Sequence, residues 1–200
     1  MKNILEHNKT IINMKTTSKL YRQIILATLL AFVALPVAAQ KWDEDKITDA
    51  AIEKSKDFET GYDLWCNDKY REAINFFEKA ARKEKIAYSW YMEGQCYEKL
   101  GFKQKANFWY SMGAQSGDPK SQYQLGVSYL TGDGVNEDEQ KGVMWITKSA
   151  QQGYWGAQFM LGTLYSMGAG VKYDEAKARY WMQKAADQGS EDAIKWLEEN

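Results

Sequence analysis

The sequence predicts an all-α protein in which similar helical hairpins stack one after another, a solenoid. Two observations predict this fold. Residues 121–153 and 157–189 repeat one pattern 36 residues apart, and a period of about 20–50 residues is typical of stacked supersecondary units. Apolar and aromatic residues also recur at helical spacing on both sides of each turn between residues 49 and 117. Repeat arrays mostly hold other molecules, so binding is the leading functional hypothesis.

The N-terminal region predicts export. Residues 15–23 carry three basic residues and no acid, and an apolar run over 24–39 follows that ends in small residues after Pro36. This order is typical of a secretory signal peptide, which would span residues 1–39 and be cleaved before Gln40. The alternative is an uncleaved membrane anchor, although the run is shorter than the roughly 20 residues that span a bilayer. Met14 is an alternative start, because the residues before it are unusual for a signal peptide. The expected location is the periplasm or the cell exterior.

The composition of the mature chain argues against several function classes. Five of the 26 basic and one of the 27 acidic residues lie in 1–39, which leaves 21 and 26 and a formal charge of −5. We therefore expect no nucleic-acid partner, because phosphate binding needs a basic surface. Cleavage also removes His7, the only histidine, and with it the usual general base and a common zinc ligand.

No S-x-x-K or G-x-S-x-G motif follows residue 39. The loop at Gly132-Asp133-Gly134 lacks the alternating acidic order of a calcium loop. We expect a protein that is not an enzyme and that uses no metal and no cofactor.

A repeat domain is predicted over residues 49–199, after a short acidic linker over 40–48. We divide it into hairpins over about 49–84, 85–117, 118–153 and 154–189, followed by a single capping helix over 190–199. Each hairpin has a first helix, A, and a second helix, B. The A–B connector is short in the first two hairpins and four residues longer in the last two, where it contains Gly-x-Gly-Val.

Local signals support these helices. Asp118 and Pro119 form an N-cap followed by proline at the first helical position. Gly132 stands where helix A must end and turn. Gly126 and Gly162 lie in the middle of helix A, where each costs about 1 kcal/mol relative to alanine. They predict a close approach of the neighbouring helix.

The last two hairpins resemble repeats of the Sel-one-like family, a branch of the tetratricopeptide-type α/α solenoids. The second copy carries the family pattern at Ala157, Leu161, Gly162, Tyr165, Gly168, Gly170, Val171, Asp174, Lys177, Ala178, Trp181, Lys184, Ala185 and Ala186. The first copy departs from it by small substitutions at Ser121, Gly142 and Ser149, and the first two hairpins match only the looser tetratricopeptide pattern. The resemblance implies a right-handed superhelix and an adaptor that holds other proteins, without naming a partner.

One aromatic column is a candidate partner-binding site. Three residues before the helix-A glycine, the hairpins carry Phe58, Tyr91, Tyr123 and Phe159. By resemblance to tetratricopeptide units, this position faces a concave groove, whereas the alternative is packing against the adjacent helix. Tyr62 and Trp65 would widen the stripe at its N-terminal end. Replacing Tyr91 and Tyr123 by alanine is then expected to weaken partner capture with little change in melting temperature.

We therefore predict a scaffold that binds a protein or peptide and meets a membrane only through an uncleaved signal sequence. A cell-wall-associated ligand-binding module and a structural subunit of an envelope assembly are the alternatives.

Two other sets of residues give weaker signals. Trp109, Trp145 and Trp181 fall at one position of helix B, which predicts that they pack between helix layers. Cys66 and Cys96 would lie in an oxidising compartment after export. They are about one helical turn out of register on neighbouring A helices, and a bridge needs Cα atoms within about 7 Å. A disulfide and two separate thiols both remain open.

Overall fold

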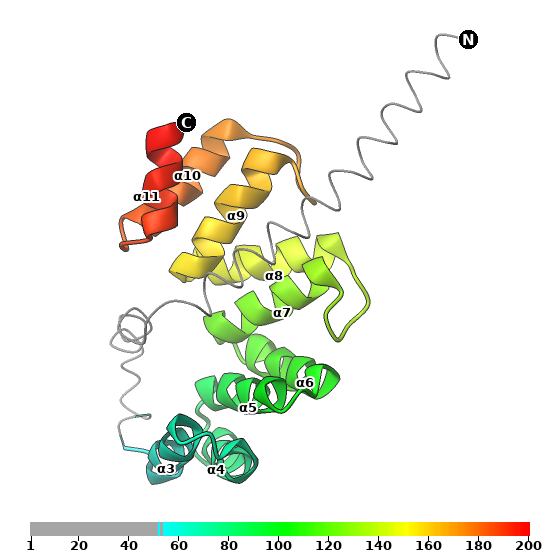
Figure 1. Cartoon of the computed structure of the whole chain (residues 1–200), viewed down its shortest axis with the longest axis vertical. Coiled ribbons are helices and arrows are strands. Elements are labelled where there is room, and N and C mark those ends of the chain that lie inside the picture. Colours follow the sequence, from blue (N-terminus) through cyan, green and yellow to red (C-terminus); the bar gives the residue numbers. More distant parts are fainter. Residues whose placement is uncertain (1–51, 53) are drawn as a thin grey trace, which may run out of the picture. The chain divides into compact units, whose positions relative to one another are not determined.

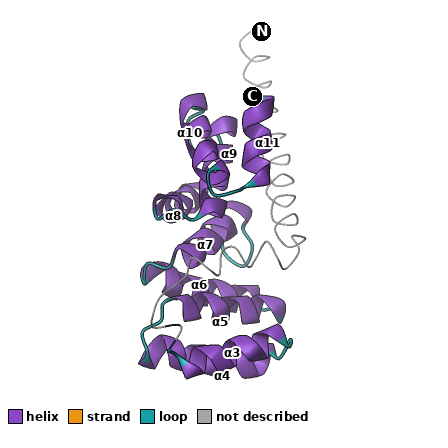
Figure 2. Ribbon diagram, turned by 90° about the vertical axis from the view of Figure 1, so that its left-hand side faces the viewer, coloured by secondary structure: helices purple, strands orange, loops and turns teal. Residues whose placement is uncertain are grey.

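The computed structural model describes residue 52 and residues 54–200, so the predicted signal peptide and linker lie outside the described residues. The chain divides into two units, residues 1–48 and 49–200, and every described residue belongs to the second unit. Each regular element described there is a helix (Figure 2). The helices are α3 (Lys56–Cys66), α4 (Tyr70–Lys83), α5 (Tyr88–Lys99), α6 (Lys103–Gln115), α7 (Pro119–Thr131), α8 (Glu139–Gln151), α9 (Trp155–Met167), α10 (Glu175–Ala186) and α11 (Glu191–Glu199).

The helices of residues 54–200 stack in chain order (Figure 1). We call α3, α5, α7 and α9 the A helices, and α4, α6, α8 and α10 the B helices. Each A helix packs on the B helix of its own hairpin, each B helix packs on the next A helix, and α11 covers α10. The predicted all-α solenoid is confirmed.

The mid-helix glycines lie where two helices of a hairpin meet, as predicted. A Cβ atom added to Gly126 would lie 2.8 Å from Cδ1 of Ile146, and one added to Gly162 would lie 3.0 Å from Cγ of Met182. Ile146 and Met182 are fully buried. The missing side chain lets α7 approach α8, and α9 approach α10, closely enough to exclude water.

Two of the repeated tryptophans pack between helix layers, as predicted: Trp109 stacks on Trp90 of α5, and Trp145 packs against the buried cluster that α6 and α7 form. Trp109, Trp145 and Trp181 are only half-buried. The residue after each of them is the one that fills the helix interface, and two of these are the Ile146 and Met182 just described. Consecutive helical residues point about 100° apart. The repeat period fixes that a position recurs, but it does not fix which of two adjacent positions faces inward.

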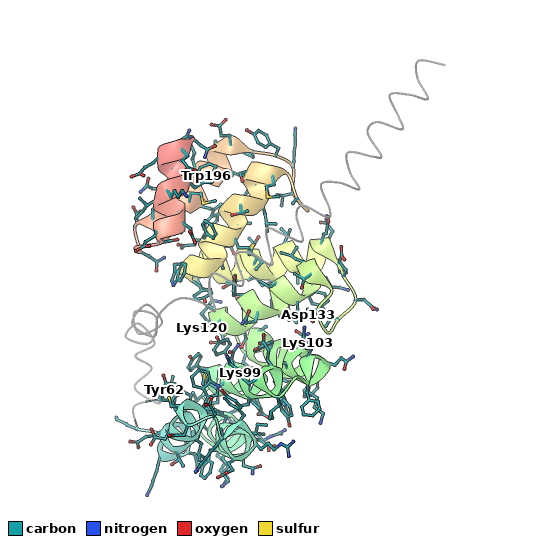
Figure 3. All side chains as sticks on the ribbon, viewed as in Figure 1. Tyr62, Lys99, Lys103, Lys120, Asp133 and Trp196 are labelled. Atoms are coloured by element: carbon teal, nitrogen blue, oxygen red, sulfur yellow. The ribbon has the colours of Figure 1, made fainter. Side chains whose placement is uncertain are left out.

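The longer connectors of the last two hairpins reach back to the preceding B helix. The Asp133 carbonyl accepts a hydrogen bond of 2.6 Å from Nδ2 of Asn107, and its carboxylate lies 2.8 Å from Nζ of Lys103 on α6 (Figure 3). The Gly170 carbonyl accepts a hydrogen bond of 3.3 Å from Nε2 of Gln140 on α8. The extra residues therefore link successive hairpins.

A recurring glutamine adds a second link between hairpins. Nε2 of Gln152 donates to the Gly117 carbonyl at 3.0 Å and to Oε1 of Gln122 at 2.8 Å. Gln188 makes the equivalent pair of bonds one period later, both at 2.8 Å. In each pair, one bond joins the end of a B helix to the last residue of the preceding hairpin, and the other joins it to the A helix of its own hairpin.

Side-chain caps set the starts of two helices, one where the sequence predicts it and one later than predicted. Asp118 caps α7, since its carboxylate accepts a 2.6 Å bond from the Ser121 amide, as predicted. The first described helix, α3, begins at Lys56, although the sequence predicts the first hairpin from about residue 49. Ser55 sets this start, because its hydroxyl oxygen accepts a 2.9 Å bond from the Phe58 amide. The side-chain cap decided the boundary.

Candidate protein-binding surface

Five aromatic rings form a continuous series across the first two A helices. On α3, the Trp65 ring stacks on Tyr62 at 6.0 Å between centroids, and Tyr62 stacks on Phe58 at 6.3 Å. Phe58 meets Tyr88 of α5 at 5.8 Å, and Tyr88 stacks on Tyr91 at 5.2 Å. Offset stacking stabilises such pairs beyond their buried area. We call these five residues the aromatic series.

A lysine from the third A helix closes this series. Nζ of Lys120, at the start of α7, lies 5.1 Å from the centroid of the Tyr88 ring and 5.8 Å from that of Tyr91. It also donates a long 3.4 Å hydrogen bond to the Tyr88 hydroxyl. Figure 3 shows Lys120 on α7 and Tyr62 on α3. Only 8% of Lys120 is exposed, so its ammonium is held in place by the rings.

A second group of rings follows on the last two A helices. Tyr123 of α7 meets Tyr154 at 5.2 Å, and Tyr154 meets Trp155, the first residue of α9, at 6.4 Å. Burial raises the pKa of Tyr123 well above its usual value. Phe159 packs against the cluster that α10 and α11 form.

The predicted column is therefore divided between core and surface. Phe58 and Tyr123 are buried, with 7% and 6% of their surfaces exposed, whereas Tyr91 and Phe159 are half-buried, as are Tyr62 and Trp65. Phe58 packs in the core of the first hairpin. The partner-binding role of all six residues stays a prediction. Burial of Tyr123 does mean that its replacement by alanine should lower stability, which changes the expectation for the Tyr91 and Tyr123 double variant.

Four residues of this surface were missed in the sequence, Tyr88, Lys120, Tyr154 and Trp155, and helical spacing could have found two of them. Tyr88 lies three residues before Tyr91, and Trp155 lies four residues before Phe159. Residues at these spacings share one face of a helix. An aromatic pair at the start of an A helix was the signal that could have found them.

The base of the surface is fixed by a polar cluster. The Tyr91 ring meets Tyr110 of α6 at 6.0 Å. The Tyr110 hydroxyl donates to the Glu98 carboxylate and accepts a 2.7 Å bond from Nε2 of Gln95. Burial, with the nearby Glu98 carboxylate, raises the pKa of Tyr110 well above its usual value. This phenol stays neutral and works as a fixed support.

The two cysteines are not joined by a disulfide in the structure. Cys66 is exposed at the end of α3, while Cys96 is completely buried in α5. Burial raises the pKa of the Cys96 thiol to about 12, and the neighbouring Glu93 contributes to the rise. Such a thiol behaves as a small apolar core residue.

Among the described residues, no three potential metal-ligating side chains lie together. Nor does the described part of the chain contain a helix with the length and apolar character needed to cross a membrane.

Comparison with known proteins agrees with the geometry. The Sel1 repeat model matches four successive segments, residues 68–85, 85–118, 119–154 and 155–190. The chain belongs to the Sel1 repeat family. The first matched segment is about half as long as the others, which agrees with the looser pattern at that end.

Solved structures give the same fold. A Sel1 repeat protein from Oxalobacter formigenes is 28% identical with a TM-score of 0.61, covering 67% of this chain and 56% of that one. A protective antigen present in uropathogenic Escherichia coli strains, which displays an SLR fold, is 29% identical with a TM-score of 0.64 and covers 79% of this chain. This chain spans only 35% of that antigen.

Cysteine rich protein B of Helicobacter pylori is 23% identical, with a TM-score of 0.53, and at this identity the likeness shows the fold alone. The match covers 64% of this chain and 93% of that one. No curated protein matches the chain.

Proposed function

We propose that this protein is an exported, non-catalytic scaffold that binds a protein or peptide segment along its A helices. Sel1 repeat proteins generally serve as protein-interaction scaffolds. The observation that supports the site is the aromatic series with Lys120, which joins three successive A helices through ring contacts. Aromatic anchors on a rigid base usually carry most of the binding energy of an interface.

The chemistry of this surface favours a particular kind of segment. Half-buried rings offer apolar faces and weakly electropositive edges. A segment with apolar and aromatic side chains would match it, whereas Lys120, of which only 8% is exposed, is already engaged with the Tyr88 and Tyr91 rings. Export is supported by the basic and apolar N-terminal sequence, which directs the search for the partner to the cell envelope.

The test compares how much partner the wild type and variants at accessible residues capture. The full chain, tagged at its C-terminus, is expressed in its native host, and proteins cross-linked to it in the envelope are identified by mass spectrometry. The variant Tyr62→Ala with Tyr91→Ala should retain less than a tenth of the specific partner. The matched control, Phe102→Ala with Tyr173→Ala, removes exposed aromatic rings elsewhere and should retain all of it. Equal capture by both variants would refute the A-helix site.

A further inference from the structure

The B helices carry a second apolar feature that the A-helix surface does not explain. Phe108, Met144 and Tyr180 lie 36 residues apart at one repeat position, with 56%, 42% and 55% of their surfaces exposed. We call them the outer row. Single exposed apolar residues are ordinary. The other exposed large apolar side chains that the structure describes share no such repeat position: Phe102, Met167, Tyr173 and Ile194.

Each member of the outer row is followed by a half-buried tryptophan. Phe108 packs edge-on against Trp109 at 4.8 Å, and Tyr180 packs in the same way against Trp181 at 5.0 Å. Trp109 in turn stacks on Trp90 of α5 at 5.2 Å with the rings nearly parallel. The exposed rings therefore stand on a fixed support, and little side-chain entropy would be lost when a partner covers them.

Charge distinguishes this surface from the A helices. The four B helices carry eleven basic and four acidic residues, whereas the four A helices carry three basic and five acidic residues. The positive charge lies beside the outer row, over one of its members and over the tryptophan that follows another. Nζ of Lys148 lies 4.3 Å from the Trp145 ring centroid, and Nζ of Lys184 lies 5.8 Å from that of Tyr180. Lys105 precedes Phe108 by three residues, hence on the same helical face, and its Nζ lies 5.2 Å from the centroid of the Phe102 ring.

We propose that the outer row and these lysines form a second docking surface, which takes an acidic amphipathic segment of a protein partner. Apolar side chains of the segment would cover the outer row, and its carboxylates would meet Lys105, Lys148 and Lys184. Complementary charge of this kind raises the association rate and selects the partner. A protein with one binding surface on its A helices and another on its B helices would join two partners.

Other anionic partners fit the surface less well. Anionic bilayers are bound by clusters of about four to eight Lys or Arg residues, whereas the outer row has one neighbouring lysine on each of its three helices. Single-stranded nucleic acid is bound by successive aromatic platforms, whereas Met144 offers no ring at the centre of the row.

The test uses the full chain and a defined probe. The probe is a fluorescein-labelled helical peptide of 20 residues, made of Glu and Leu with Leu on one face, and its counterpart has Lys in place of every Glu. Fluorescence anisotropy should show binding of the Glu peptide, weakened by added salt, and at least tenfold weaker binding of the Lys peptide. Phe108→Ser with Met144→Ser and Tyr180→Ser should weaken binding of the Glu peptide at least tenfold.

Controls separate this site from the fold and from the A-helix site. Met167→Ser with Tyr173→Ser and Ile194→Ser should leave the affinity unchanged, and so should Tyr62→Ala with Tyr91→Ala. If the apolar variants unfold, charge reversal decides the question without altering the apolar row. Reversal to Glu at Lys105, Lys148 and Lys184 should abolish binding, whereas reversal at Lys56, Lys172 and Lys195 should not.

Several results would overturn the proposal. These are no binding of the Glu peptide, equal binding of both peptides, or affinity that survives both outer-row variants. Binding of phosphatidylglycerol vesicles or single-stranded DNA in place of the Glu peptide, lost in the outer-row variants, would assign the surface to those partners. A dimer in sedimentation that the outer-row variants dissociate would assign it to a second copy of the chain.

Discussion

A buried glutamate should make the stability of this protein depend on pH. Glu93 on α5 stands one residue before the helix-A glycine, where the last two hairpins have Leu125 and Leu161. Only 1% of Glu93 is exposed, and within the described residues no hydrogen-bond donor meets its Oε2 atom. A carboxylate in such a place loses its hydration without compensation. The chain tolerates it by keeping the group protonated.

The direction and size of the effect follow from the pKa. Burial, together with the Glu78 carboxylate, raises the pKa of Glu93 from 4.5 to about 8, against the lowering effect of Arg82. The folded protein therefore binds a proton that the unfolded chain releases between these two values. The stabilisation that this proton provides is fully present below about pH 4.5 and is lost as the pH rises through about 8. Each pH unit in this window is worth about 1.4 kcal/mol, or roughly 5 kcal/mol in all.

Urea unfolding followed by far-ultraviolet circular dichroism at pH 5, 7 and 9 measures this dependence. Glu93→Gln should match the wild type at pH 5 and exceed its free energy of unfolding by several kcal/mol at pH 9. Glu93→Leu, which restores the residue of the later repeats, should be more stable than the wild type at pH 7 and pH 9. Glu84→Gln, at an exposed carboxylate on the end of α4, is the matched control and should behave as the wild type. Parallel pH profiles of Glu93→Gln and the wild type would refute the reasoning.

Three further outcomes are expected. Gly126→Ala should lower the free energy of unfolding by about 1–2 kcal/mol despite the better helix propensity of alanine, because its Cβ atom would meet Ile146; an unchanged urea midpoint would contradict the close approach. Thiol labelling of the native protein at pH 8 should modify Cys66 quickly and Cys96 only after unfolding, while no labelling in urea without reductant would reveal a disulfide. Intact mass spectrometry of the native protein should show a chain that starts at Gln40, and retention of residues 24–39 would indicate an anchor instead.

The sequence alone determined the fold class and the places where helices meet. A 36-residue period, helical spacing of apolar residues and glycine at the ends of helices are local signals, and each has a local physical cause. The cap at Asp118 and the close approach at Gly126 could be predicted for this reason. A short polar side chain or a missing Cβ atom acts on its immediate neighbours whatever the rest of the chain does.

The candidate sites needed the tertiary structure. The repeat period showed that Phe58, Tyr91, Tyr123 and Phe159 share a position, but only packing of successive hairpins buried two of them and left two half-buried. The same packing placed Lys120 against rings about 30 residues away in sequence. It also turned the residue before each tryptophan outward and the one after it inward. Periodicity fixes which residues are equivalent, whereas burial depends on what the neighbouring hairpin places against them.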